Sequence, residues 1–129
     1  MDNIINISSE RDNQGSPIIN IIANKLQPMK DFSPVFIYTL NIVNKSLHIS
    51  KNELNTFSIV ININCSGVNK KNIHPAFFFS LIKYLKKNYK NIIKQINIIN
   101  VSNTYKNIFN KIFYLLDNDT KQKIKFINN

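Results

Sequence analysis

The sequence is short of glycine, cysteine and long apolar runs, and each shortage excludes a class of protein. Gly15 and Gly67 are the only glycines, so neither a phosphate-binding loop nor a GxGxxG dinucleotide turn is available. Cys65 is the only cysteine, which excludes an internal disulfide and favours a reducing compartment. No apolar run approaches the roughly 18 residues of a spanning helix, and the N-terminus does not resemble a signal peptide. We therefore expect a cytoplasmic protein.

Candidate catalytic and metal-binding residues are equally scarce. No acidic residue lies between Leu54 and Leu116, so no carboxylate pair can serve acid–base chemistry at the ends of the central strands. His48 and His74 lack Cys, Asp or Glu neighbours at metal-ligand spacing. Cys65 would need His74 as a base to act as a nucleophile, and a buried or loop thiol is the simpler interpretation. The sequence predicts no enzyme, no metal and no cofactor.

Positive charge is concentrated in the second half of the chain. The formal net charge is +10, from 17 basic and 7 acidic residues among 129. Between Leu54 and Leu116 there are nine lysines and no acid. Such a surface attracts anionic lipid, nucleic acid or an acidic protein. An ordinary lysine-rich, solubilising surface explains the same pattern.

Short isoleucine-rich runs alternate with amphipathic segments. The runs predict strands at residues 17–24, 57–64, 95–101 and 123–128, and a further run at 3–7 is predicted to pair with the strand from Pro17. Asparagine at every other position of the central strands leaves one face polar. Together with three helices between the strands, this order predicts an α/β fold with a mainly parallel sheet and right-handed crossovers.

Three helices are predicted, each with an apolar stripe that faces the sheet. The first helix begins with Ser33 as its N-cap. The second begins around His74 and Pro75, and the third begins near Asn103 or Thr104. The three stripes are Phe36, Ile37, Leu40, Val43 and Leu47; Phe78, Leu81, Ile82, Leu85 and Tyr89; and Tyr105, Ile108, Phe109, Ile112 and Leu116.

The second predicted helix also carries a lysine pattern on another face. The lysines recur at helical spacing, and they form one ridge if the helix extends far enough. Near an anionic membrane each such lysine gains on the order of 1 kcal/mol. An ordinary solvated helix face is the alternative interpretation. The residues are Lys83, Lys86, Lys87, Lys90 and Lys94.

The order of motifs in the C-terminal half resembles the signature region of CRAL-TRIO lipid-binding domains. The matching features are Ile98-Ile99-Asn100, Leu115-Leu116-Asp117 and Lys123-Ile124. Near the N-terminus, DNQGSP resembles the family's Asp-x-x-Gly-Arg-Pro strand entry, with Ser16 in place of arginine. Segments YKNIIK and GSPIINIIANKLQP are closer to the divergent branch found in Rho GTPase-activating proteins. This resemblance divides the chain into an N-terminal extension or edge strand at 1–11 and a domain at 12–129.

The resemblance implies binding or transfer of a phospholipid or other hydrophobic ligand, without catalysis. In the phosphatidylinositol-transfer members, a threonine and a lysine that contact the inositol phosphate align with Thr120 and Lys123. A glutamate completes that site in the family, and Asn91 stands in its position here. The family continues into a gating helix beyond the equivalent of Asn129, so we expect a CRAL-TRIO-like fold lacking that helix, with one sheet face uncovered.

Three functions are open at this point. The first is a lipid-binding module, cytoplasmic and peripheral to the membrane, that meets phosphoinositide or another phospholipid at an anionic membrane surface. The second is a protein-interaction scaffold or homodimer without a lipid pocket. Nucleic-acid binding ranks last, because the phenylalanines have the spacing of a core rather than of an exposed stacking platform.

Overall fold

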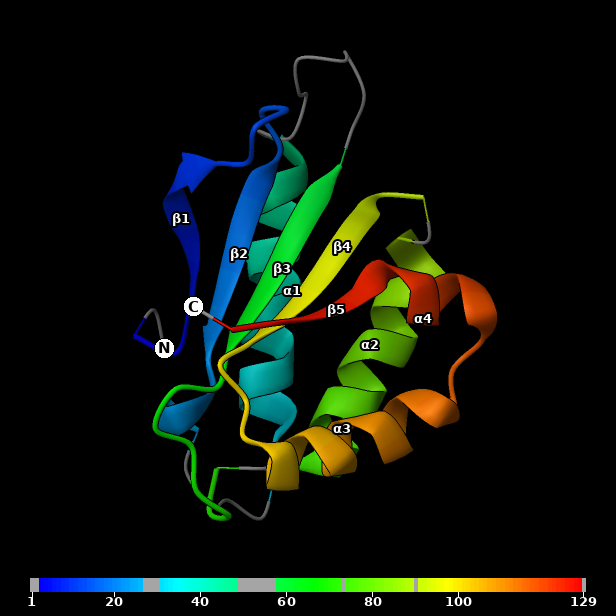
Figure 1. The fold of residues 1–129 in the computed structure, drawn as a ribbon. Coiled ribbons are helices and arrows are strands. Elements are labelled where there is room, and N and C mark those ends of the chain that lie inside the picture. Colours follow the sequence, from blue (N-terminus) through cyan, green and yellow to red (C-terminus); the bar gives the residue numbers. More distant parts are fainter. Residues whose placement is uncertain (1–2, 27–30, 49–57, 73, 90, 129) are drawn as a thin grey trace.

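A computed structural model describes residues 3–26, 31–48, 58–72, 74–89 and 91–128, which build one five-stranded sheet with flanking helices (Figure 1). The predicted α/β class with a mainly parallel sheet is confirmed. In chain order the elements are β1 (Ile5–Arg11), β2 (Pro17–Ile22), a 3₁₀ turn (Ala23–Lys25), α1 (Ser33–His48), β3 (Ile59–Asn64), α2 (Pro75–Tyr89), β4 (Ile93–Ile99), α3 (Asn103–Tyr114), α4 (Asn118–Lys123) and β5 (Ile124–Ile127).

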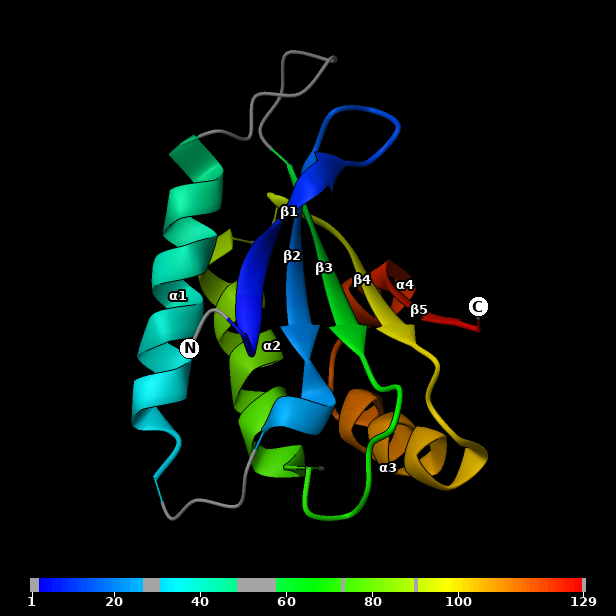
Figure 2. The same cartoon turned by 90° about the vertical axis from the view of Figure 1, so that its left-hand side faces the viewer.

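The strands lie in the sheet in the same order as in the chain, β1-β2-β3-β4-β5. Only β1, which lies at one edge of the sheet, is antiparallel to its neighbour; the other pairs are parallel. Crossovers between parallel strands are almost always right-handed, so an order that never reverses puts all crossover helices on one face. Figure 2 shows α1 and α2 on one side of the sheet, while no described helix covers the other side of β1–β4. We call this uncovered side the open face.

Isoleucine and asparagine alternate between the two faces because consecutive strand residues point to opposite sides of a sheet. Buried isoleucines from β2, β3 and β4 stand in register on the helix-covered face. An asparagine row crosses four strands in register on the open face. The expectation that one face is polar is therefore confirmed. The row consists of Asn6, Asn20, Asn62 and Asn97.

Helix α1 packs through most of the predicted stripe: Val43 is buried, and Phe36, Leu40 and Leu47 pack against the core. Its buried positions include Thr39 and Ser46, whereas Ile37 is 58% exposed. The hydroxyls of Thr39 and Ser46 donate to carbonyls one turn earlier, at Val35 and Ile42, so their burial leaves no unpaired group. The placement of Ile37 in the core was wrong. A pattern of apolar residues does not show that Thr39 and Ser46 can be buried when their hydroxyls bond to carbonyls of the same helix.

A second correction concerns the segment before the last strand. The sequence predicted a turn and then a strand from Lys123, but residues 118–123 form the short helix α4 and β5 begins at Ile124. The Asp117 side chain caps α4 by accepting the backbone N–H of Thr120 at 2.9 Å. The six residues of α4 are all polar and show no apolar periodicity. The capping residue Asp117 was therefore the only feature of the sequence that could have indicated this helix.

The remaining boundaries differ from the predicted ones by small amounts. Helix α1 already includes Ser33, since the N–H of Phe36 donates to the carbonyl of Phe32. Strand β2 ends at Ile22 because a 3₁₀ turn follows, and β4 runs two residues earlier than predicted. The predicted start of the third strand at Phe57 lies outside the described residues.

A core isoleucine on β3 and an exposed isoleucine on α1 should respond differently to truncation. Ile63 on β3 is 1% exposed, so Ile63→Ala leaves a cavity and lowers the free energy of unfolding by about 2–5 kcal/mol. Ile37→Ala changes it by less than about 0.5 kcal/mol, because that side chain already contacts water. Urea denaturation of the two variants measures both values. An equal loss of unfolding free energy in the two variants would contradict the exposed position of Ile37 on α1.

Candidate functional site

A cleft of about 460 Å³ lies at the margin of the open face, where β4, α4 and β5 meet. Three lysines, three amides and one carboxylate line it, so its charge is positive. We call it the cationic cleft. Its lining residues are Asn91, Lys94, Gln95, Asp119, Gln122, Lys123 and Lys125.

An irregularity in β4 brings two neighbouring residues to the cleft. Ile59 pairs with Ile93, but the next residue of β3 pairs with Gln95, so Lys94 is an extra residue in the ladder. Such a bulge lets adjacent side chains point to similar sides of a sheet. Lys94 and Gln95 therefore both line the cleft, while Ile93 and Ile96 on either side are buried.

The residues that the resemblance selected meet in this region. Asn91 and Lys123 line the cationic cleft together. Thr120 lies beneath it, 6% exposed, and lines a cavity of about 20 Å³ with Lys123 and core side chains. A cavity of that size holds about one water molecule. The ligand-binding roles of these three residues stay predictions.

The four described lysines of the predicted ridge do not share one surface. Lys83 and Lys87 are exposed on α2, whereas Lys86 forms an ion pair with Asp117. Helix α2 ends at Tyr89, and Lys94 lies on β4 at the open face. The predicted Lys90 position is outside the described residues.

The Lys86–Asp117 pair ties α2 to the cap of α4. Hydrogen bonds from Lys86 and from the side chain and backbone of Thr120 hold the pKa of Asp117 well below its usual range. The ionised Asp117 carboxylate therefore offsets the charge of Lys86 near neutral pH.

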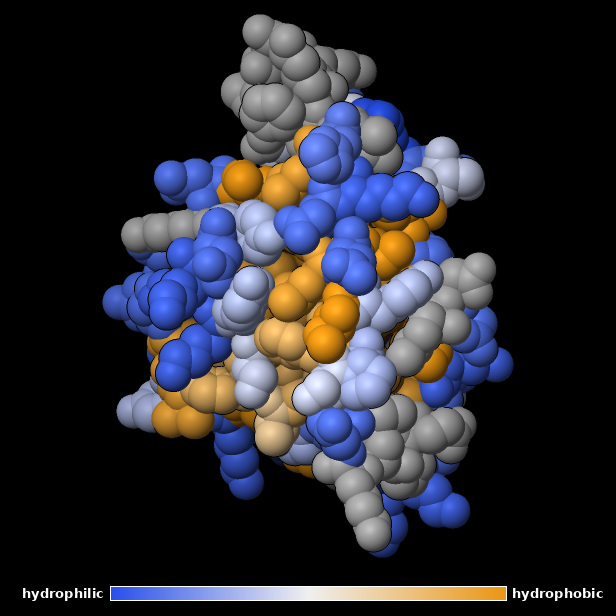
Figure 3. Space-filling view, turned by 180° about the vertical axis from the view of Figure 1, so that it is seen from behind, coloured by the Kyte–Doolittle hydropathy of each residue, from blue (hydrophilic) through white to orange (hydrophobic). Residues whose placement is uncertain are grey.

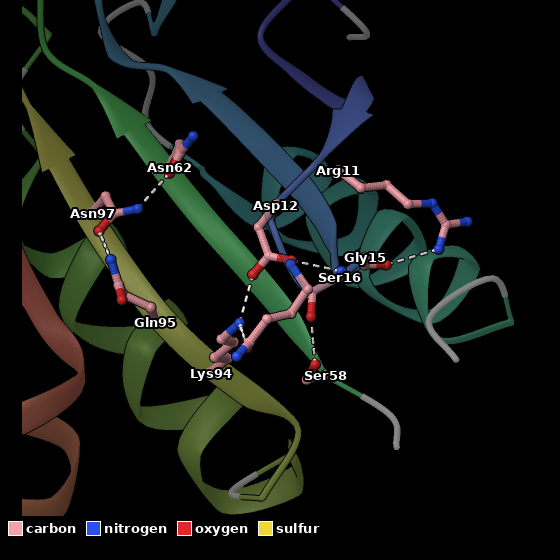
Figure 4. A network of polar contacts seen from close by, with 10 residues as sticks. Arg11, Asp12, Gly15, Ser16, Ser58, Asn62, Lys94, Gln95 and Asn97 are labelled. Carbon is pink, nitrogen blue, oxygen red and sulfur yellow. Dashed lines mark hydrogen bonds and ion pairs between the residues drawn. The ribbon is translucent and has the colours of Figure 1, made fainter. Parts of the chain in front are cut away.

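Lys94 is held from the opposite side by the β1–β2 turn (Figure 4). The Asp12 carboxylate accepts Lys94 Nζ at 2.6 Å and the backbone N–H groups of Gln14 and Ser16 at 3.0 and 2.7 Å. The Gln14 side chain also contacts Lys94 Nζ. The turn depends on Gly15, whose φ of 85° is accessible chiefly to glycine. The sequence signals the turn but not its partner, which lies 82 residues away.

A second depression of about 350 Å³ continues the open face beyond Lys94. It shares Lys94 and Gln95 with the cationic cleft and contains five amide side chains and the Asp12–Lys94 pair. We call it the amide depression. It was not predicted from the sequence. Its lining residues are Asp12, Asn13, Gln14, Ile18, Val60, Asn62, Lys94, Gln95 and Asn97.

The opposite side of the molecule is apolar at its centre. Figure 3 shows hydrophobic side chains gathered there, over α1 and α2. A groove of about 410 Å³ runs between these helices and is lined by Phe36, Ile37 and Phe77 among others. We call it the apolar groove.

Cys65 and His74 do not form a nucleophile–base pair. Burial raises the pKa of the Cys65 thiol to about 12, so the thiolate is not populated near neutral pH. Burial lowers the pKa of His74, whose ring packs against Phe32 with centroids 4.5 Å apart. Across the described residues, no three His, Cys, Asp or Glu side chains gather in a metal-binding group. None of the described helices combines the length and apolar character needed to cross a bilayer.

Comparison with known proteins identifies relatives of this architecture. The CRAL/TRIO domain family matches residues 1–129, the whole chain. Among solved structures, Sfh5 superposes with a TM-score of 0.79 at 13% sequence identity, over 98% of this chain. The match spans 47% of Sfh5, so this chain corresponds to about half of that protein. No curated protein matches the sequence. The finer placement in the branch of the Rho GTPase-activating proteins stays a prediction.

The contacts of Asp12 predict a pH-dependent contribution to stability. Burial raises the pKa of Asp12, but the bonds from Lys94, Ser16 and Gln14 outweigh this and leave it below 3.8. A lowered folded-state pKa stabilises the protein above the unfolded value, and this gain is lost as the pH falls through the folded value. Asp12→Asn therefore lowers the free energy of unfolding by about 1 kcal/mol at pH 7, and the difference from wild type vanishes in acid.

Urea denaturation between pH 2 and pH 7 measures this profile. In a Lys94→Gln background, Asp12→Asn should cost distinctly less, because its charged partner is gone. A cost that is independent of pH and of Lys94 would contradict the assignment of the ion pair.

Proposed function

Since the chain belongs to the CRAL/TRIO domain family, we propose that it is a non-catalytic module that binds the head group of an anionic phospholipid, such as a phosphoinositide, at a membrane surface. CRAL/TRIO domains bind lipids or other hydrophobic ligands. The observation that carries the proposal is the cationic cleft, where Asn91 and Lys123 lie together with Lys94 and Lys125.

The chemistry of the cationic cleft fits a phosphate group. Lysine ammonium groups supply positive charge and hydrogen-bond donors, although Lys94 already donates to Asp12 and Gln14. The amides of Asn91, Gln95 and Gln122 add neutral donors. The three lysines outnumber the carboxylates of Asp119 and of Asp12, which pairs with Lys94, so the net charge at the cleft is positive. The absence of acids between residues 54 and 116 extends this potential over neighbouring surface.

The dimensions around the cationic cleft favour binding at a surface over enclosure of a whole lipid there. Pockets that enclose a small molecule have volumes of about 300–1,000 Å³ and apolar walls. In the described residues, the cavity beneath the cleft measures about 20 Å³, and the open face above is polar. A head group can therefore occupy the cleft while the acyl chains remain in the bilayer. A cytoplasmic protein that binds membranes peripherally follows from this proposal.

Two double charge-reversal variants distinguish membrane binding at the cleft from binding through positive charge elsewhere on the surface. Lys123→Glu with Lys125→Glu changes the cleft, and Lys83→Glu with Lys87→Glu changes the net charge equally on α2. Co-sedimentation with vesicles containing phosphatidylinositol 4-phosphate should show at least about tenfold weaker binding for the cleft pair, at about 1 kcal/mol per lysine. The α2 pair should lose much less.

Salt and lipid composition supply the control for this experiment. Binding should weaken as ionic strength rises, because the attraction is screened. Equal binding to neutral and anionic vesicles, or equal losses in the two charge-reversal pairs, would reject the cleft as the head-group site.

The apolar groove favours a second candidate function, a scaffold that forms a homodimer. Ile37 and Tyr84 are 58% and 37% exposed on this side. Exposed apolar surface of this kind is typical of interaction sites. A two-fold dimer would bury the same groove on both copies.

Light scattering tests this candidate directly. Ile37→Asp should convert a dimer to a monomer without loss of circular dichroism, since the side chain is outside the core. A wild-type protein that stays monomeric at high concentration would remove the candidate.

A further inference from the structure

Strand β5 has one unpaired edge in the part of the chain that the structure describes. It is the last strand in the sheet order and pairs only with β4 (Figure 1). The N–H and C=O of one strand residue point to the same side within the sheet, and those of the next residue point to the opposite side. The carbonyl of Ile127 accepts the N–H of Asn100 at 2.8 Å, so Ile127 and Lys125 bond toward β4. The backbone groups of Ile124 and Phe126 therefore face outward.

Most of these outward groups are available to a further strand. The N–H of Ile124 is already used, because it donates to the carbonyl of Lys121 at the end of α4. The carbonyl of Ile124 and both backbone groups of Phe126 have no backbone partner within the described ranges. Unpaired donors and acceptors on an edge strand bind an added strand, which supplies the missing hydrogen bonds. The outer edge of β5 is therefore complementary to an extended polypeptide.

A hollow of about 330 Å³ lies beside this edge, between β5 and α3. The side chains of Ile124 and Phe126 line it from the helix-covered side of the sheet, because their register partners on β4 are buried on that side. Tyr114 of α3, which is 79% exposed, supplies an aromatic wall. The hollow can accept an apolar side chain of an added strand. We call it the edge hollow; its lining residues are Asn110, Phe113, Tyr114, Lys121, Ile124 and Phe126.

Positive charge flanks the edge hollow on both faces of the sheet. Lys106 Nζ lies 4.8 Å from the ring centroid of Phe126, and Lys121 Nζ lies 5.0 Å from that of Tyr114. Lys125 is exposed on the open face, in register with the asparagine row. The described residues that line the hollow include no carboxylate. This distribution of charge attracts an acidic partner.

A second copy of this chain is a poor occupant of the same edge. Two β5 strands side by side would bring Lys121 and Lys125 near the same lysines of the other copy, and the formal net charge of +10 adds to the repulsion. Lysine on an edge strand protects proteins from such self-pairing, but it does not repel an acidic strand. A lipid surface offers no row of backbone groups in register with the edge.

We propose that the outer edge of β5 binds an extended acidic segment of a partner protein as an additional strand. In an antiparallel arrangement, the partner residue opposite Phe126 exchanges both backbone bonds with it and directs its side chain to the side of the edge hollow. The next partner residue points to the open face, beside Lys125. The segment that fits therefore alternates apolar side chains with Asp or Glu. Failure of the head-group proposal leaves this strand addition intact, because neither the edge hollow nor the backbone of β5 takes part in it.

The peptide acetyl-Glu-Phe-Glu-Val-Glu-Ile-Glu-amide has this pattern and serves as the probe. Titration followed by ¹H–¹⁵N NMR should show saturable shifts at the backbone amides of residues 124–127. Hydrogen exchange of the Phe126 N–H should slow, because that group gains an acceptor. The same peptide with N-methyl groups on its apolar residues, whose N–H groups face β5, should bind at least about tenfold more weakly. A scrambled peptide of the same composition should bind at least about fivefold more weakly.

Variants of the protein separate the edge hollow from general positive charge. Lys106→Glu with Lys121→Glu should weaken binding of the peptide at least about tenfold. Lys83→Glu with Lys87→Glu, on α2, changes the net charge equally and should weaken it much less. Tyr114→Ala removes only an exposed wall of the hollow and should weaken binding about fivefold. This single variant keeps the comparison available if the charge-reversal variant does not fold.

Several results would overturn the strand addition. These are no binding of the alternating peptide, equal binding of the alternating, scrambled and N-methylated peptides, or shifts confined to β1, the other edge of the sheet. Shifts at Phe126 that depend on protein concentration without peptide would assign the edge to a second copy. Absence of peptide binding, together with vesicle binding that is lost in the Lys106→Glu and Lys121→Glu variant, would assign it to a membrane.

Discussion

The handedness of the crossovers is the constraint on which this structure depends. Parallel strands joined in chain order by right-handed connections place their helices on one face of the sheet. The alternation of isoleucine and asparagine follows from that arrangement, since one face contacts helices and the other contacts solvent. A sheet without a reversal of strand order also lacks the crevice at which many α/β proteins bind ligands. The ligand site that we propose accordingly lies at a margin of the sheet and on its open face.

The bulge in β4 creates the candidate site on that open face. By adding Lys94 to the ladder, it brings a lysine and an amide to the same side, next to α4 and β5. The Asp12 carboxylate of the β1–β2 turn then holds Lys94 between the cationic cleft and the amide depression. Positive charge and amide side chains thus lie side by side on a surface that no described helix covers. This combination favours recognition of a polar head group.

Much of this fold could be predicted from the sequence, because period-two and helical patterns report burial directly. The isoleucine–asparagine alternation predicts one polar sheet face. The family resemblance points to Asn91 and Lys123, which line the cleft together, and their role in binding stays a prediction. Three features could not be predicted, because none of them leaves a periodic pattern in the sequence. The exposure of Ile37 on α1 depends on hydroxyl–carbonyl bonds within that helix. Helix α4 depends on a single capping residue, and the bulge in β4 depends on a shift of register. The Asp12–Lys94 pair depends on a contact between distant segments.

The central claim is that ligand binds on the open face rather than on the helix-covered side. Hydrogen–deuterium exchange of the protein with and without phosphoinositide-containing nanodiscs tests this most directly. The account predicts increased protection in residues 91–97 and 119–125 and unchanged exchange along α1. Protection confined to α1 and α2, with none at β4, α4 and β5, would contradict it.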